Sequence, residues 1–466
     1  MPKHDGALRA LGANPSMRYI ASWIAAGAAM VLVLLAPALW NGWPVIYPDT
    51  GGYLARPLTG TLGLGRSAFY GAFLLAGLPL EFWPNVIIQA ALTSWLVVLI
   101  LRTHGLGRRP LLAVAIVLLL AIATSLPWFV SLLMPDAFFP IAVLALHLLI
   151  FRANTLTRHE RIGLCAVVVF AIVSHMAMVG LAAGMIAALW FLRWFARVTQ
   201  PRLWIATLTV AAGLFLAPLS NALITGHFVF TPGGTSFLFG RLIEDGIVTR
   251  YLDEKCPEPV LHICAYRNEI SRDTDDWLWK NDSPFWKLGG WQGYEEEERR
   301  IIWATLARYP IAHATTALRA ATLQFILFTS NFSNEPGDNA PTLGIFKDYA
   351  PQLLPNLRAA RLEAAPFDAD PLNFVHVPVA TISLVVVIVA VIWRRRLHVA
   401  SETTALSASV LLALVLNAAI CGVFSHPDDR YQSRLIPLAT LATAVLLLRA
   451  RAAARPPSAC FPASPH

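Results

Sequence analysis

Runs of about twenty apolar residues, separated by short polar or basic segments, recur along the 466-residue chain. A helix of roughly twenty residues crosses the ~30 Å hydrocarbon core of a bilayer. Backbone groups in hydrocarbon must be hydrogen-bonded within their own segment, so these runs are expected to be helices. The chain is 56% hydrophobic and only 14% charged, whereas soluble proteins typically carry about 25% charged residues. The sequence therefore predicts an all-α polytopic integral membrane protein.

The Lys and Arg residues cluster at the ends of the apolar runs, where the positive-inside rule places them in the cytoplasm. The formal charge of +8 has this origin and does not argue for a nucleic-acid partner. Threading the chain by this rule predicts about ten spans, with one large and one smaller outer-face insertion. The expected parts are a cytoplasmic N-terminus (1–18), a membrane bundle (19–224) with a first outer loop (41–85), an outer-face region (225–373), C-terminal membrane helices (374–449) and a cytoplasmic tail (450–466).

The apolar stretch 162–195 is too long for one span, about 50 Å as a single helix, and short for two. Basic residues flank both of its ends, which places both ends in the cytoplasm. A tight hairpin that turns at SHMA meets both conditions and leaves His175 at the tip, near the outer face. A hydrogen-bonding turn residue is the favoured interpretation of His175, and a place in the floor of a cavity is the alternative.

The outer-face region contains Cys256 and Cys264 in the segment KCPEPVLHIC. A disulfide between them is expected if the region faces an oxidising compartment, and two unpaired thiols are the alternative. The helix expected in HATTALRAATLQFILFTSNF is amphipathic and should lie on, or dip into, the outer leaflet. The aromatics in DDWLWKNDSPFWKLGGWQGY suit either stacking on sugar rings or anchoring at the membrane interface.

Two acids follow apolar segments at the predicted outer face. Asp49, in YPDTGGYL, is explained either as a turn residue or as a functional carboxylate. Asp136, after Pro135, is explained either as a helix-capping acid or as an ionisable group at membrane depth, where such a group is a functional candidate.

The segment HPDDRYQSR precedes the last span and places two arginines at the predicted outer end of that span. Arginine there runs against the positive-inside tendency, so an anionic partner is expected. The guanidinium fork suits phosphate oxygens. The candidate residues of this segment are His426, Asp428, Asp429, Arg430, Tyr431 and Arg434.

Three motifs share the predicted outer face: YPDTGGYL, ATLARYPIAHATTAL and RYQSRLIPL. Their arrangement resembles that of the polyprenyl-phosphate-sugar-dependent glycosyltransferases of the GT-C fold, such as protein O-mannosyltransferases and lipid A aminoarabinose transferases. Many of those enzymes carry adjacent acids in the first loop, whereas Asp49 is followed here by Thr50. The resemblance therefore implies a single catalytic carboxylate.

The resemblance implies an inverting transfer of a sugar from a polyprenyl-phosphate donor to a hydroxyl of a lipid, glycan or protein acceptor. Asp49 would accept the hydroxyl proton, and Arg430 and Arg434 would stabilise the donor phosphate. Supporting or cavity-lining residues would be Asp136, His175, His426, Asp428, Asp429 and Tyr431. No cofactor is identified, and a divalent cation is left open.

The composition is rich in Ala, Arg and Leu, which suggests a bacterium with a GC-rich genome. Because the polar motifs face outward, a bacterial inner membrane location with a periplasmic active face is expected. Two alternatives remain at this point: a lipid or glycan transporter, and a non-catalytic membrane assembly protein. A transporter should show broken helices in two related halves, and the sequence shows no evident internal repeat.

Overall fold

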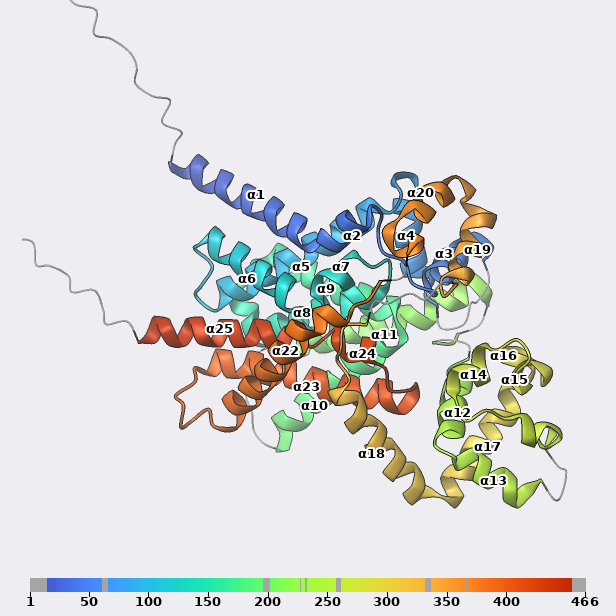
Figure 1. The fold of residues 1–466 in the computed structure, drawn as a ribbon. Coiled ribbons are helices and arrows are strands. Elements are labelled where there is room, and N and C mark those ends of the chain that lie inside the picture. The colour runs from blue at the N-terminus through green and yellow to red at the C-terminus, as the bar shows by residue number, and fades with distance from the viewer. Residues whose placement is uncertain are drawn as a thin grey trace, which may run out of the picture.

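The computed structural model describes residues 15–60, 66–195, 202–226, 228–230, 233–256, 261–331, 337–365 and 367–454. Most of the expected N-terminal segment and of the C-terminal tail lies outside the described residues. All regular structure in these ranges is helical, apart from an isolated bridge between Val45 and Leu132. Figure 1 shows a helical bundle with a smaller helical lobe on one side.

Eight helical segments within the described ranges are long and apolar enough to cross a membrane. They centre on α1 (Pro15–Leu34), α5 (Trp83–Thr103), α8 (Phe138–His147), α10 (Met176–Phe195), α11 (Leu203–Thr225), α22 (Asp370–Ile392), α23 (Ser401–Phe424) and α25 (Pro437–Ala453). Two shorter helices, α6 (Pro110–Ala123) and α9 (Arg158–Ser174), stand where the other two spans are expected. The chain is thus an all-α, multi-pass membrane protein, and the count of ten spans stays a prediction.

The helices of the bundle bring their basic ends together. Glu402, at the start of α23, pairs with Arg152 just beyond α8 (3.3 Å) and with Arg449 near the end of α25 (3.6 Å). Arg102 near the end of α5 pairs with Glu160 at the start of α9 (2.6 Å). In Figure 1, α1 begins and α25 ends on the left, away from the lobe. We call this side the basic end.

The opposite side, which we call the site end, carries the insertions. The first follows α1 and comprises α2 (Ala36–Asn41), α3 (Thr50–Thr59) and α4 (Ala68–Gly77). The lobe comprises α12 (Gly234–Glu244), α13 (Ile247–Lys255), α14 (Thr274–Trp279), α15 (Pro284–Lys287), α16 (Gly290–Gly293) and α17 (Glu295–Arg308). The chain then continues through α18 (Pro310–Ile326), α19 (Ala340–Tyr349), α20 (Leu354–Ala359) and α21 (Arg361–Ala364) before it enters the bundle again at α22.

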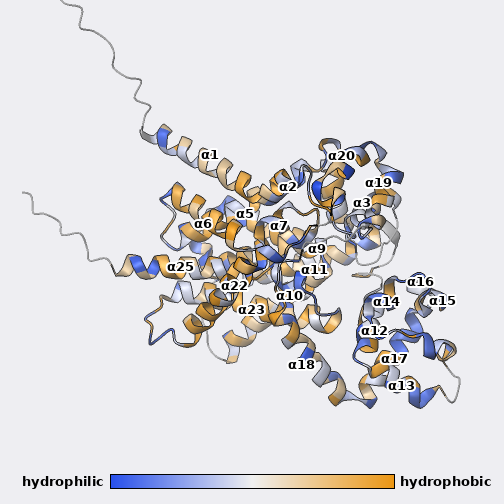
Figure 2. Ribbon diagram, viewed as in Figure 1, coloured by the Kyte–Doolittle hydropathy of each residue, from blue (hydrophilic) through white to orange (hydrophobic). Residues whose placement is uncertain are grey.

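The lobe has a hydrophobic core of its own, built around buried aromatics such as Phe239, Trp277 and Phe285. Cys256 and Cys264 form a disulfide at its edge, with their Cα atoms 5.3 Å apart. Figure 2 shows hydrophilic residues distributed through the lobe, whereas the bundle helices are mostly hydrophobic. The lobe is therefore built as a polar domain attached to an apolar bundle.

Helix α18 connects the two parts and packs along α23. At Gly422 the helices approach closely, because a Cβ there would stand 2.7 Å from the Ala320 carbonyl oxygen. Ile311 and Leu318 point away from α23 and are exposed apolar side chains. One face of α18 thus contacts protein while another is apolar and uncovered, which agrees with the amphipathic pattern.

Candidate functional site at one end of the bundle

The chain between α6 and α8 is broken into short pieces at the site end. Helix α7 (Leu126–Ser131) is followed by an extended stretch that pairs with the first insertion. Val45 N–H donates to the carbonyl oxygen of Ser131 (2.9 Å), and Leu133 N–H donates to the carbonyl oxygen of Val45 (2.8 Å). Pro135 disfavours helical geometry in the preceding residue, and Met134 is accordingly extended. A short turn over Pro135–Ala137 then starts α8. This break places Asp136 at the site end of the bundle, just before α8.

Asp136 receives two arginines from the far end of the chain. Arg430 donates from Nη2 to Oδ2 (2.7 Å) and from Nε to Oδ1 (3.2 Å), and Arg434 Nη1 donates to Oδ1 (3.0 Å). Asp136 is fully buried, where a carboxylate without partners would carry a large desolvation cost. The sequence left open whether Asp136 caps a helix, and the structure uses its carboxylate to pair with these arginines instead.

Arg434 is fully buried beneath this pair. Its Nη2 donates to the Asn417 side chain (3.1 Å) and faces Cys421 Sγ (3.4 Å), and its guanidinium lies 3.5 Å from the centre of the Phe139 ring. This burial departs from the expectation that Arg434 contacts a donor phosphate. A separation of four residues places Arg430 and Arg434 on the same face of a helix. It does not determine how deeply each side chain lies in the bundle, which depends on tertiary packing.

Asp49 stands at the N-cap position of α3, yet its carboxylate makes no capping hydrogen bond. It forms an ion pair with Arg66, and Arg430 Nη1 lies 3.9 Å from its other oxygen. The guanidinium of Arg430 also covers the ring of Tyr47 at 4.1 Å. The side chains of Asp49, Arg66 and Arg430 are 30%, 18% and 12% exposed, so these three form the accessible part of the cluster. The sequence pattern around Arg66 gives no signal of this contact, since no spacing rule places Arg66 next to Asp49.

Thr342 of α19 holds the turn that carries Asp49. Its hydroxyl accepts from Gly51 N–H (2.8 Å) and lies within hydrogen-bonding distance of the carbonyl oxygens of Tyr47 (2.9 Å) and Pro48 (2.8 Å). Gly51 is required by this contact, since a Cβ there would stand 2.7 Å from the Thr342 Cα. The second insertion thus fixes the position of the first.

The two acids of HPDDRYQSR serve the backbone. Asp428 caps α24 (Asp429–Ser433) by accepting from Arg430 N–H (2.8 Å), and its own backbone pairs with the Gln324 side chain of α18. Asp429 accepts from Thr329 N–H (2.7 Å). The resemblance placed both acids among the supporting residues, and in the structure they shape the loop that presents Arg430.

The remaining candidates border the charged cluster. His426 Nε2 lies 3.9 Å from Asp275 of the lobe, and its ring stands edge-on to Tyr431 (6.3 Å between centroids). His175 occupies the break between α9 and α10, where the hairpin turn is expected, and its ring packs on Phe139 at 5.2 Å. His426 thus marks where the lobe meets the site.

Five side chains of alternating charge contact one another in a row: Arg66, Asp49, Arg430, Asp136 and Arg434. Three guanidiniums face two carboxylates, so the five side chains together favour an anion. Within the described ranges, no group of three or more His, Cys, Asp or Glu side chains is arranged to hold a metal ion.

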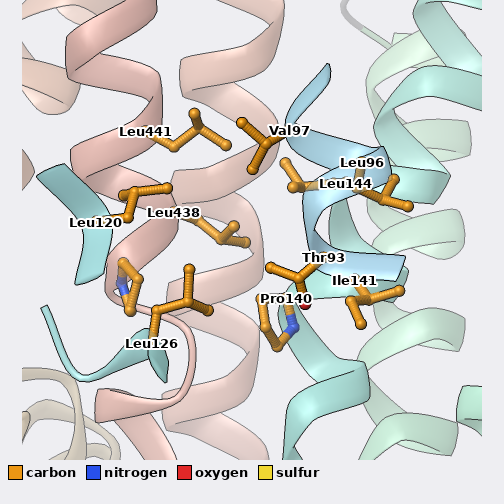
Figure 3. Close-up of a pocket in the computed structure, with 11 residues that line it drawn as sticks. Thr93, Leu96, Val97, Leu120, Leu126, Pro140, Ile141, Leu144, Leu438 and Leu441 are labelled. Carbon is orange, nitrogen blue, oxygen red and sulfur yellow. The ribbon is translucent and has the colours of Figure 1, made fainter. Parts of the chain in front are cut away.

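A small pocket lies among α5, α6, α8 and α25 (Figure 3). Thr93 supplies its one polar side chain, and the rest of the lining is apolar. Pro140 and Leu438 of the lining follow Asp136 and Arg434 by four residues, about one helical turn. The pocket therefore lies just inside the charged cluster and has no charged group of its own.

Comparison with known proteins adds no family to this geometry. No protein-family model, curated protein or solved structure matches the chain. The side chains of the site are therefore the basis for assigning its function.

Proposed function

We propose that this protein is a membrane glycosyltransferase that moves a sugar from a polyprenyl-phosphate donor to an acceptor hydroxyl, with inversion. The observation that carries the proposal is the accessible trio of Asp49, Arg66 and Arg430 at one end of an apolar bundle. A carboxylate that takes up a proton, beside two guanidiniums that bind an anion, matches the needs of a lipid-phosphate leaving group.

In the proposed reaction, the acceptor oxygen attacks the anomeric carbon while the bond from that carbon to the phosphate oxygen breaks. The hydroxyl proton passes to Asp49, and the bonding electron pair leaves with the phosphate. Arg66 and Arg430 stabilise the phosphate charge as it develops. Arg66 pairs with Asp49 in this structure, so donor binding would draw Arg66 to the phosphate and free a carboxylate oxygen for the acceptor.

Asp136 and Arg434 act as positioning residues in this scheme. The bidentate bond from Arg430 to Asp136 fixes the plane of the guanidinium, and Arg434 donates a further hydrogen bond to Oδ1 of that buried carboxylate. A pre-positioned guanidinium costs no reorganisation during the reaction. This assignment moves the second phosphate contact from Arg434 to Arg66.

The positive-inside rule supports a periplasmic position for the site end in a bacterial inner membrane, since the basic clusters gather at the other end. The acceptor would then be a lipid, glycan or protein of the cell envelope, and the donor's lipid chain would run along the apolar bundle.

A transporter of lipid-linked sugars is the second candidate. The broken segment before α8 and the buried charges on it favour this function, because transporters place irregular backbone and ionised groups where the substrate passes. The two candidates differ in their products: a transporter moves the lipid-linked sugar intact, whereas a transferase releases polyprenyl phosphate.

The proposal is tested by profiling the envelope glycans and lipids of a strain that lacks the protein. We expect one sugar modification to be absent, and to return with the wild-type chain but not with Asp49→Asn. An unchanged profile, or full complementation by Asp49→Asn, would contradict the proposal.

A further inference from the structure

Four aromatic rings of the lobe form one surface patch. The ring of Trp291 on α16 packs against Trp279 on α14 (5.6 Å between centroids), Trp286 on α15 (6.4 Å) and Phe237 on α12 (5.5 Å). Trp291 is buried and serves as the floor, whereas Trp279 and Trp286 retain 46% and 41% of their surface. We call these four residues the lobe aromatic patch.

The patch borders the charged site. Asp275 precedes Trp279 by four residues on α14, about 6 Å along the helix and on the same face. Asp275 in turn lies 3.9 Å from His426, in the loop that presents Arg430. Figure 1 shows α14, α15 and α16 gathered at one edge of the lobe, with α13 at the opposite edge. A molecule that rests on the patch therefore reaches the site along α14.

We propose that the lobe aromatic patch binds sugar rings of a carbohydrate acceptor. The inference rests on the proposed glycosyl transfer and specifies its acceptor class. The C–H face of a sugar ring is apolar and packs on a flat indole, while its hydroxyls need acceptors at the rim. Asp275 and Asp282 are exposed carboxylates, each within four residues of an exposed tryptophan of the patch in the chain, and they can supply such acceptors.

Charges around the patch argue against insertion into the bilayer. Lys280 and Lys287 directly follow Trp279 and Trp286, and Asp282 lies between the two tryptophans in the chain. All three charged side chains are exposed. Burying the indoles in hydrocarbon would draw these charges toward it, at a high desolvation cost. The same charges are compatible with a hydrated, polyhydroxylated ligand.

The test uses the purified full chain in nanodiscs and short linear manno-, gluco- and arabino-oligosaccharides as probes, with binding measured by calorimetry. We expect at least one probe to bind, and Trp279→Ala and Trp286→Ala to weaken that binding about tenfold or more. Trp303→Ala is the matched control, because Trp303 is an exposed tryptophan on α17 outside the patch, and it should bind as the wild type does. Trp279→Phe, which keeps an aromatic ring, should retain most of the binding.

Three results would overturn the inference: no probe binds the wild type, the alanine variants bind normally, or they lose affinity for anionic lipid vesicles instead of sugars. Amide hydrogen exchange in the lobe must match the wild type, so that lost binding does not reflect unfolding. Asp49→Asn separates this claim from the proposed function. Normal transfer by Asp49→Asn alongside patch-dependent sugar binding would refute the catalytic role of Asp49 and leave the carbohydrate site standing.

Discussion

Asp136 and Arg430 lie 294 residues apart in the chain and form a bidentate ion pair, with 2.7 Å between Oδ2 and Nη2 and 3.2 Å between Oδ1 and Nε. The pair ties the broken segment before α8 to the short helix before α25. It also orients Arg430 so that its remaining nitrogen lies 3.9 Å from Asp49. The packing of the bundle and the proposed chemistry therefore depend on the same buried carboxylate.

Replacing Asp136 with Ala should destabilise the whole bundle. Arg434 would remain buried without its carboxylate, and breaking a buried pair in this way typically costs about 3–5 kcal/mol. Thermal unfolding of the detergent-solubilised protein measures the effect. Asp370→Asn, a change at an exposed acid of α22, is the control and should unfold like the wild type. Equal stability of Asp136→Ala and the wild type would show that the pair is not structural.

Replacing Arg66 with Ala should weaken donor binding while the fold remains intact. Charge-assisted hydrogen bonds contribute about 1.5–3 kcal/mol, so the KM for the donor should rise by roughly tenfold to a hundredfold. Arg66→Lys should restore only part of the affinity, because an ammonium lacks the planar fork. Arg299→Ala, at an exposed arginine of the lobe, should leave KM unchanged. An unaltered KM in Arg66→Ala would remove Arg66 from the phosphate site.

Replacing Thr342 with Val should lower kcat more than it raises KM. The variant keeps the shape of the side chain but loses the hydrogen bonds to the turn that carries Asp49. A small displacement of a catalytic group can cost a large factor in rate, and we expect a fall in kcat of about tenfold. Thr342→Ser keeps the hydroxyl and should restore kcat. If both variants turn over at the wild-type rate, α19 does not position Asp49.

Replacing Glu298 with Gln should remove a pH dependence of lobe stability. Burial raises the pKa of Glu298 to about 8, with a smaller contribution from Glu295, against the opposing hydrogen bond from Ser236 (2.5 Å). The folded lobe therefore holds this proton more tightly than the unfolded chain. The resulting stability is complete below about pH 4.5, the ordinary range of Glu, and is lost as the pH rises toward 8.

Hydrogen exchange in the lobe between pH 6 and 9 measures this effect. The wild type and Glu296→Gln, a change at the exposed neighbour, should lose protection as the pH rises, whereas Glu298→Gln should retain it. Parallel pH profiles for all three proteins would show that Glu298 does not control the stability of the lobe.

The sequence predicts the helical bundle and the grouping of Asp49, Asp136 and Arg430 because apolar run length and basic flanks constrain a membrane chain strongly. Helix direction alone determines which loops share an end of the bundle. The hairpin break at His175 follows from the same length argument, and α9 and α10 are indeed separate helices on either side of it.

Such rules do not predict which side chains contact one another at that end of the bundle. Arg66 follows a glycine-rich stretch with no periodic signal, and Thr342 lies 291 residues from the Gly51 amide that it accepts from. The burial of Arg434 likewise depends on how α23 and the break before α8 pack around it, which no local spacing encodes. The residues that the sequence missed or misplaced are those whose roles arise from contacts between distant segments.

Release of polyprenyl phosphate tests the central claim most directly. A lipid extract and a cell-envelope fraction from the deletion strain, which should contain the unused donor and the unmodified acceptor, are incubated with the purified protein, and the lipids are analysed by mass spectrometry. We expect the wild type to release polyprenyl phosphate and Asp49→Asn to release it at least about a hundredfold more slowly, in line with the loss of a general base. No release by the wild type, or equal release by Asp49→Asn, would contradict the assignment of this end of the bundle as a glycosyl-transfer site.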